Sequence, residues 1–143
     1  MKTNLILLTV AAMLLSSTRL HAQTSGKKIL VAYFSHSGNT RAVAYDICKK
    51  VDGEFFEIQT VKPYSIDYNT VVDIAKRELK ADFRPELKSK LKNSGQYDVI
   101  FVGYPNWWGT YPQAVKVFLS TMIFREKRLF RFVRTKVVNS DVV

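Results

Sequence analysis

The sequence contains a single cysteine, Cys48, which excludes an internal disulfide. It contains neither a G-x-x-x-x-G-K-S/T motif nor a G-x-G-x-x-G motif, so the usual signatures of a nucleoside triphosphate site and of a dinucleotide site are missing. Repeats and low-complexity segments are also missing. With 143 residues and 47% hydrophobic content, the chain fits one globular domain at most.

The sequence lacks an apolar run long enough to cross a membrane. The run from Leu5 to Leu15 is shorter than the ~20 residues that a transmembrane helix needs. It follows Lys2 and precedes small and polar residues that end at Ala22, which is the pattern of a secretory signal peptide. We therefore expect residues 1–22 to be a signal peptide. The remaining chain is expected to be exported, periplasmic or secreted, and free of the membrane.

The lone Cys48 has two possible roles. A free thiol can act as a nucleophile, but Cys48 falls on a stripe with Ala44, Ile47 and Val51 at helical spacing. Buried cysteine behaves as a small hydrophobic side chain. We favour packing over catalysis.

The net charge of +10 is spread unevenly. Residues 23–120 carry 14 basic and 10 acidic side chains, whereas residues 121–143 carry six basic and two acidic ones. The densest internal basic run, residues 84–93, predicts a short amphipathic helix with Leu87 and Leu91 inward and lysines in solvent. The charge distribution therefore favours a solvated surface here, and we expect that the protein does not bind nucleic acid.

Apolar runs alternate with helical patterns along the chain. Strands are expected at residues 27–34, 54–61 and 97–104, and helices after residue 38, at 69–79 and in the segment that ends at Ser120. Asn39 or Thr40 is expected to cap the first helix, which Gly53 ends, and Pro112 is expected in the first turn of the last helix. This alternation predicts an α/β fold with a doubly wound parallel sheet.

The turn "SHSGNT" follows the first strand and contains no acidic residue. In doubly wound sheets, ligands bind beyond the carboxyl ends of the strands. A helix that begins there offers free backbone N–H groups to an anion. Gly38 allows close approach, and the hydroxyl and amide side chains supply further donors. The turn is thus suited to a phosphate, although an ordinary helix cap has the same composition.

The loop "YPNWWGTYP" follows the third strand at the same edge of the sheet. Large aromatic side chains at a loop tip either fold into the core or stack on a planar ligand, and we expect one tryptophan in each role. Backbone groups of residues 106–109 could bond the polar edge of a flat heterocycle. A phosphate at one loop and a flat ring at the other describe a mononucleotide such as FMN.

The segments "LVAYFSHSGNTRAVA", "VKPYSIDYNTVVDIAKREL" and "YDVIFVGYPNWWGTYPQAV" resemble the flavodoxin family over residues 27–120, especially its exported bacterial members. The resemblance implies a sheet of order 2-1-3-4-5 that binds FMN. It places Ser35, His36, Ser37, Gly38, Asn39 and Thr40 around the phosphate, and Pro105, Asn106, Trp107, Trp108 and Gly109 beside the ring. His36 would contribute its backbone N–H. The resemblance implies no catalytic residue and no metal.

The resemblance stops near Ser120, and the fourth and fifth strands of the family are expected to be missing or altered. "RLFRFVRTKVV" alternates weakly, and as a strand it would turn arginines inward. We therefore divide the chain into the signal peptide, a flavodoxin-like domain at 23–120 and an aberrant basic tail at 121–143. The tail is expected to be an out-of-frame translation that begins at about Thr121.

Three functions are compatible with these features. The favoured one is an FMN-binding carrier that exchanges electrons with a redox partner protein, although the basic charge departs from the acidic surface usual in flavodoxins. A flavin-dependent reductase that acts on NAD(P)H or a quinone would share both loops. The third is an inactive remnant that no longer binds FMN.

Overall fold

The computed structural model describes residues 26–122 and 128–134 of the chain. Its elements, in chain order, are β1 (Ile29–Tyr33), α2 (Asn39–Val51), β2 (Glu54–Glu57), α3 (Tyr68–Ala81), a short 3₁₀ helix (Ser94–Gln96), β3 (Val99–Pro105), α4 (Gln113–Ser120) and β4 (Arg128–Arg134). The expected signal peptide, residues 1–22, lies outside the described residues. Within the described ranges, no helix combines the length and apolarity of a membrane span.

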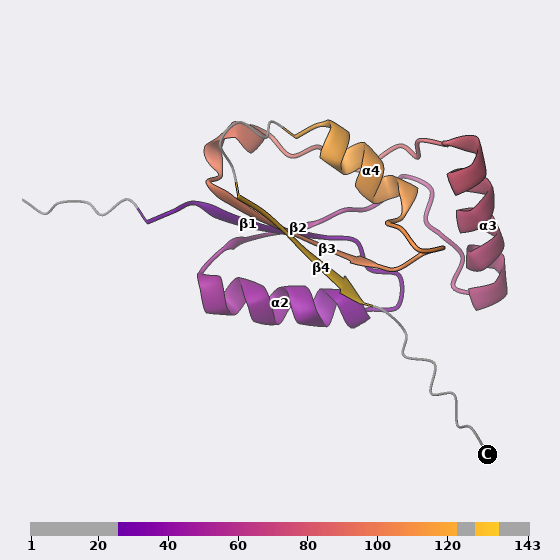
Figure 1. Cartoon of the computed structure of the whole chain (residues 1–143), viewed down its shortest axis with the longest axis horizontal. Coiled ribbons are helices and arrows are strands. Elements are labelled where there is room, and N and C mark those ends of the chain that lie inside the picture. The colour runs from indigo at the N-terminus through magenta and orange to yellow at the C-terminus, as the bar shows by residue number, and fades with distance from the viewer. Residues whose placement is uncertain (1–25, 123–127, 135–143) are drawn as a thin grey trace, which may run out of the picture.

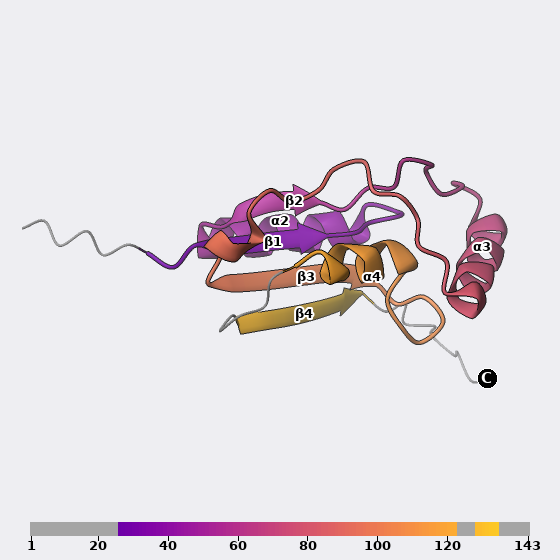
Figure 2. The same ribbon diagram turned by 90° about the horizontal axis from the view of Figure 1, so that it is seen from above.

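The four strands form one parallel sheet in the order β2-β1-β3-β4 (Figures 1 and 2). Strands that follow one another in the sequence are connected through a helix: α2 between β1 and β2, α3 between β2 and β3, and α4 between β3 and β4. Parallel strands require such crossover connections. The expected α/β doubly wound parallel sheet is therefore confirmed. Its order equals the first four positions of the expected 2-1-3-4-5 arrangement.

Helices α2 and α4 cover opposite faces of the sheet (Figure 1). Alternate residues of β1 divide between the faces: Leu30 and Ala32 join the core under α4, whereas Val31 and Tyr33 join the core under α2. Both cores are apolar, so the central strands read as continuous hydrophobic runs. Cys48 packs against the α2 core, and burial raises the pKa of its thiol. The expected packing role is confirmed.

Helix α3 covers neither face and lies beyond the carboxyl ends of the strands (Figures 1 and 2). Asp67 caps its start, because its carboxylate accepts the Thr70 N–H at 2.7 Å. Near its other end, Tyr64 donates to the Glu78 carboxylate at 2.7 Å, and Lys116 of α4 pairs with Asp82. These contacts fix α3 as an outer wall at the edge of the sheet where ligands bind in this class of fold.

Three local expectations are wrong. Helix α2 is not capped by Asn39 or Thr40, because the capping position is Gly38 at φ 86°, without a side-chain hydrogen bond. It ends at Val51, with Asp52 rather than Gly53 at its C-cap. Pro112 precedes α4 at the capping position instead of lying in its first turn.

Residues 84–93 also form no helix. Their backbone runs antiparallel to residues 59–61, with Val61 N–H bonded to Glu86 O and Lys88 N–H bonded to Gln59 O. Leu87 and Leu91 still pack against the core, as expected. The spacing of the two leucines therefore predicts their buried side correctly but predicts the wrong backbone conformation. Pro85 and the hydrogen bonds to residues 59–61 favour an extended backbone here.

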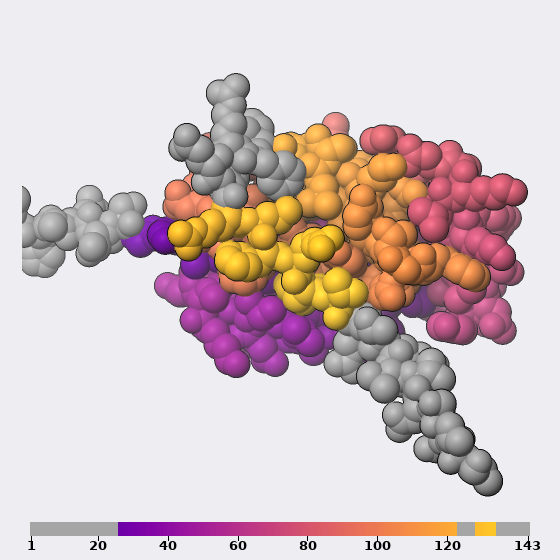
Figure 3. All heavy atoms as spheres, in the orientation of Figure 1, coloured from indigo at the N-terminus to yellow at the C-terminus, as the bar shows by residue number. Residues whose placement is uncertain are grey.

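Strand β4 belongs to the segment that we expected to be an aberrant tail. It pairs with β3 from Val99↔Arg128 to Pro105↔Arg134 and lies at the surface between α2 and α4 (Figure 3). A fourth strand is thus present in altered form. The expectation that its arginines would turn inward is wrong for Arg128 and Arg131, which are exposed, while Phe132 is half-buried against the core under α2. No fifth strand occurs among the residues described. Residues 123–127 and 135–143 lie outside them, so the division at Ser120 stays a prediction.

Candidate functional site

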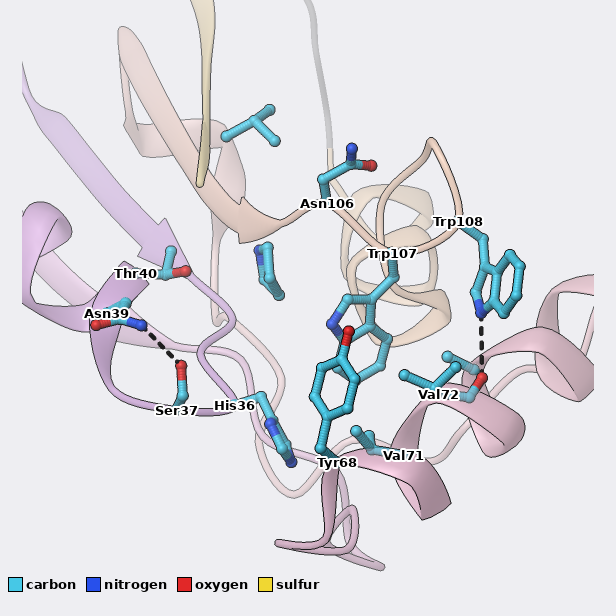
Figure 4. A pocket seen from close by; sticks show the side chains of 13 residues that line it. His36, Ser37, Asn39, Thr40, Tyr68, Val71, Val72, Asn106, Trp107 and Trp108 are labelled. Carbon is cyan, nitrogen blue, oxygen red and sulfur yellow. Dashed lines mark hydrogen bonds between the residues drawn. The ribbon is translucent and has the colours of Figure 1, made fainter. Parts of the chain in front are cut away.

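A cavity of about 1060 Å³ opens at the carboxyl edge of the sheet (Figure 4). Its walls come from the turn after β1, from the first half of α3, from the loop after β3 and from the end of β4. The lining residues are His36, Ser37, Asn39, Thr40, Tyr68, Val71, Val72, Ala75, Pro105, Asn106, Trp107, Trp108 and Val133. None of them is acidic, so nothing in the lining repels an anion.

The turn after β1 forms the polar end of the cavity (Figure 4). Gly38 has φ 86°, a backbone conformation that favours glycine. A Cβ at this position would meet nothing within 4 Å, so the turn needs glycine for its backbone conformation and not for lack of space. Ser35 Oγ accepts the Arg41 N–H at 3.3 Å, and Asn39 Nδ2 donates to Ser37 Oγ at 3.1 Å. These contacts lie at the positive end of α2, where the start of a helix favours an anion.

His36 connects this turn to the segment before α3. Its Nε2 lies 2.6 Å from the carbonyl oxygen of Ser65, and the ring contacts Trp107 edge-on, with centroids 6.0 Å apart. Because a carbonyl only accepts hydrogen bonds, Nε2 carries the proton. The imidazole therefore serves as a bridge between segments.

Trp107 anchors the loop after β3 in an aromatic cluster. Its ring makes edge contacts with Phe34 at 5.4 Å and Tyr64 at 5.1 Å between centroids. It is half-buried against the α4 core and also lines the cavity. Trp107 therefore combines core packing with a place in the cavity lining. Which tryptophan stacks on a planar ligand stays a prediction.

Trp108 is exposed and turned toward α3. Its indole Nε1 donates to the carbonyl oxygen of Val72 at 3.1 Å, and Lys76 Nζ lies 4.9 Å from the centroid of the ring (Figure 4).

Trp107 and Thr110 exchange both backbone hydrogen bonds, at 2.9 and 3.0 Å. The backbone N–H of Trp107 is therefore used within the loop and cannot serve a ligand.

Sequence reasoning missed the α3 wall. Tyr68, Val71, Val72 and Ala75 line the cavity, and Val71 and Ala75 are almost fully buried. The helical spacing of Val72 and Ala75 places both on one side of a helix, but it does not show what that side faces. The signal that could have found the wall is Tyr68, an aromatic at the start of a helix whose own apolar stripe is short.

Eight of the eleven predicted site residues line the cavity together. Ser35, Gly38 and Gly109 lie in the same turns but do not line it. Ser35 faces a smaller cavity of about 200 Å³, shared with Arg41, Glu57 and Lys88. The structure therefore brings the two predicted loops to one site and adds a third wall between them.

The comparisons with known proteins identify the family. The family model described as flavodoxin matches residues 28–140, and the chain belongs to this family. The matched range extends beyond Ser120 and includes β4. A search of curated proteins finds no match to this chain.

Solved structures share the fold. A protein assigned to the flavoproteins from Bacteroides eggerthii DSM 20697 is 34% identical with a TM-score of 0.71, and the match covers 77% of this chain and 72% of that one. A similar protein from Bacteroides uniformis ATCC 8492 is 35% identical with a TM-score of 0.71, covering 78% and 74%. A flavoprotein from Lactobacillus acidophilus NCFM, solved in complex with FMN, is 26% identical with a TM-score of 0.71, covering 80% and 78%.

Proposed function

We propose that this chain binds FMN in the cavity at the carboxyl edge of its sheet and acts as an electron-transfer protein. The observation that carries the proposal is the division of the cavity into a donor-rich turn at one end and an aromatic and aliphatic pocket at the other. A related flavoprotein binds FMN, which supports the choice of ligand.

The turn fits a phosphate. The N–H groups of residues 36–40 lie at the start of α2, where the helix dipole favours negative charge. Thr40 is buried yet borders the cavity, so its hydroxyl is a donor in a partly dry setting. Hydrogen bonds to a charged acceptor are the stronger kind. We assign the phosphate of FMN to this turn.

The opposite end fits the ring. Trp107 offers a flat surface, and Asn106, Trp108 and Gly109 have backbone N–H groups outside the Trp107–Thr110 pair. When bound, FMN would supply the redox chemistry, exchanging one or two electrons. The residues of this chain bind and orient the ring and exclude water from it. We assign His36 no proton-transfer role: its Nε2 is bonded to the Ser65 carbonyl oxygen, and its backbone N–H is the group that we place at the phosphate.

Flavin titration of the purified protein tests the proposal. We expect FMN to bind much more tightly than riboflavin, which lacks the phosphate. After reduction by dithionite without oxygen and removal of the excess, the bound flavin should stay reduced until an acceptor protein is added. Oxidation of NAD(P)H with a quinone and no protein partner would instead support the reductase. Equal affinity for the two flavins would contradict the phosphate assignment, and absence of binding would support an inactive remnant.

The proposal also covers the cellular location of the protein and the kind of partner with which it exchanges electrons. The signal-peptide pattern of residues 1–22 supports export, and electron carriage requires a redox partner protein. Residues 23–120 carry a basic excess, which favours a partner with an acidic contact surface. Fractionation of cells that express the full chain would test the location.

A further inference from the structure

Trp108 occupies a backbone position that disfavours it. Trp108 has φ 52° and Gly109 has φ 77°, and the flanking residues exchange both backbone hydrogen bonds. This is the geometry of a type I′ turn, in which Asn-Gly is the preferred pair. A bulky side chain at positive φ is strained and persists only when its surroundings hold it. The contacts that hold the tryptophan in this conformation must therefore lie outside the turn.

The indole joins the turn to α3. Its Nε1 donates to Val72 O at 3.1 Å, and Lys76 Nζ sits 4.9 Å from the ring centroid. The contacts of Glu78 and Asp82 with Tyr64 and Lys116 hold the second half of the helix. Trp108 acts on the first half, the part that lines the cavity (Figure 4).

The side of α3 that lines the cavity is apolar, as a pocket for a flat ring requires. Val71, Val72 and Ala75 are aliphatic, and Tyr68 adds an aromatic side chain. Across from them lies the polar turn of Ser37, Asn39 and Thr40. A ligand with a phosphate in that turn would turn its apolar part toward α3. The wall is therefore positioned to cover the ring and not the phosphate.

We infer that Trp108 is a positioning residue, which docks α3 as the wall of the ring pocket, and that this wall determines affinity for the flavin ring. The inference rests on the proposed function. Since the edge of the indole is bonded to Val72 and Lys76 lies over the ring, Trp108 itself does not stack on the ligand. We call this contact between Trp108 and α3 the latch. Its loss lowers the affinity for FMN and for riboflavin by the same factor, because the phosphate contacts are made elsewhere.

Two variants separate this role from turn stability. Trp108→Asn places a turn-preferring residue at the strained position and removes the latch, so the flavin-free protein should melt at the same or a higher temperature. Trp108→Phe keeps an aromatic ring beside Lys76 but lacks the donor. Tyr45→Ala is the matched control, because Tyr45 is 50% exposed like Trp108 and has Lys49 Nζ 4.6 Å from its ring, on α2.

Flavin titration and amide hydrogen exchange then decide the matter. We expect both Trp108 variants to lose about tenfold in affinity for FMN and for riboflavin, the scale of one hydrogen bond. Amides of residues 71–76 should exchange faster in both, with other helices unchanged, and Tyr45→Ala should match the wild type.

Wild-type flavin affinity in Trp108→Asn, or unchanged exchange at residues 71–76, would overturn the inference. A loss of affinity for FMN alone would also overturn it, because that result points to the phosphate turn. If the wild-type protein binds no flavin, the proposed function fails, and the exchange measurement by itself still decides whether Trp108 docks α3.

Discussion

Thr40 provides the clearest residue-scale test of the phosphate turn. Replacing it with Val keeps the shape of the buried side chain but removes the hydroxyl. We expect FMN binding to weaken by about 1–2 kcal/mol, the worth of a hydrogen bond to a charged group. Isothermal titration calorimetry with FMN measures the change.

The control ligand for Thr40→Val is riboflavin, whose affinity should stay nearly constant. Ser89→Ala is the control variant, since Ser89 is exposed and does not line the cavity. An equal loss for both flavins would mean that Thr40 supports the fold and not the phosphate.

Glu78 makes stability depend on pH. Burial raises the pKa of its carboxyl, and the hydrogen bond from Tyr64 lowers it only in part. A carboxyl whose pKa is raised by folding favours the folded state below its unfolded pKa, and this contribution is lost as the pH rises through the raised value. Glu78→Gln keeps an acceptor for Tyr64 but cannot ionise.

We therefore expect Glu78→Gln to gain in melting temperature relative to the wild type as the pH rises from about 4 to 7, across the titration of a carboxyl with a raised pKa. A constant difference between Glu78→Gln and the wild type across that range would show that the Glu78 carboxyl is not perturbed by burial.

At the scale of elements, β4 is attached through a close contact with β3. Gly103 pairs with Phe132, and a Cβ on Gly103 would lie 2.1 Å from the phenyl ring. Gly103→Ala should therefore force the strand outward and destabilise the fold by roughly 1–3 kcal/mol, as overpacking does. Urea denaturation measures this, with Gly26→Ala as control because nothing lies within 4 Å of a Cβ there. A neutral Gly103→Ala would argue against the described pairing of β4.

The elements differ in how well the sequence predicts them. The strands β1 and β3 could be predicted because burial on both faces leaves long apolar runs. The segment around Leu87 could not, because its hydrogen bonds go to residues 59–61, which are close only after folding. The same holds for the α3 wall: spacing shows that Val72 and Ala75 face something, but the sheet and the cavity edge are equivalent in sequence. Strained Trp108 gives no sequence signal at all.

At the scale of the whole molecule, β4 forms one edge of the sheet among the residues that the structure describes. Leu129, Phe130 and Val133 are exposed there, between α2 and α4 (Figure 3). An exposed apolar edge strand is a template for pairing with another chain, and arginines are a partial defence. We expect concentration-dependent aggregation, which Leu129→Lys should reduce. Light scattering at increasing protein concentration measures it, and Leu79→Lys, an equally exposed site on α3, is the control. Equal relief by both variants would mean that charge alone, and not the edge, governs association.

The cavity draws its lining from residues 36–40, 68–75, 105–108 and 133, so nearly the whole described chain must fold before it exists. Occupancy and folding are then thermodynamically linked: a ligand at one hundred times its dissociation constant would add about 2.7 kcal/mol to the free energy of unfolding. Parallel sheets also close slowly, because their contacts span long loops. If FMN binds in this cavity as proposed, the supply of cofactor would raise the share of the chain that is folded.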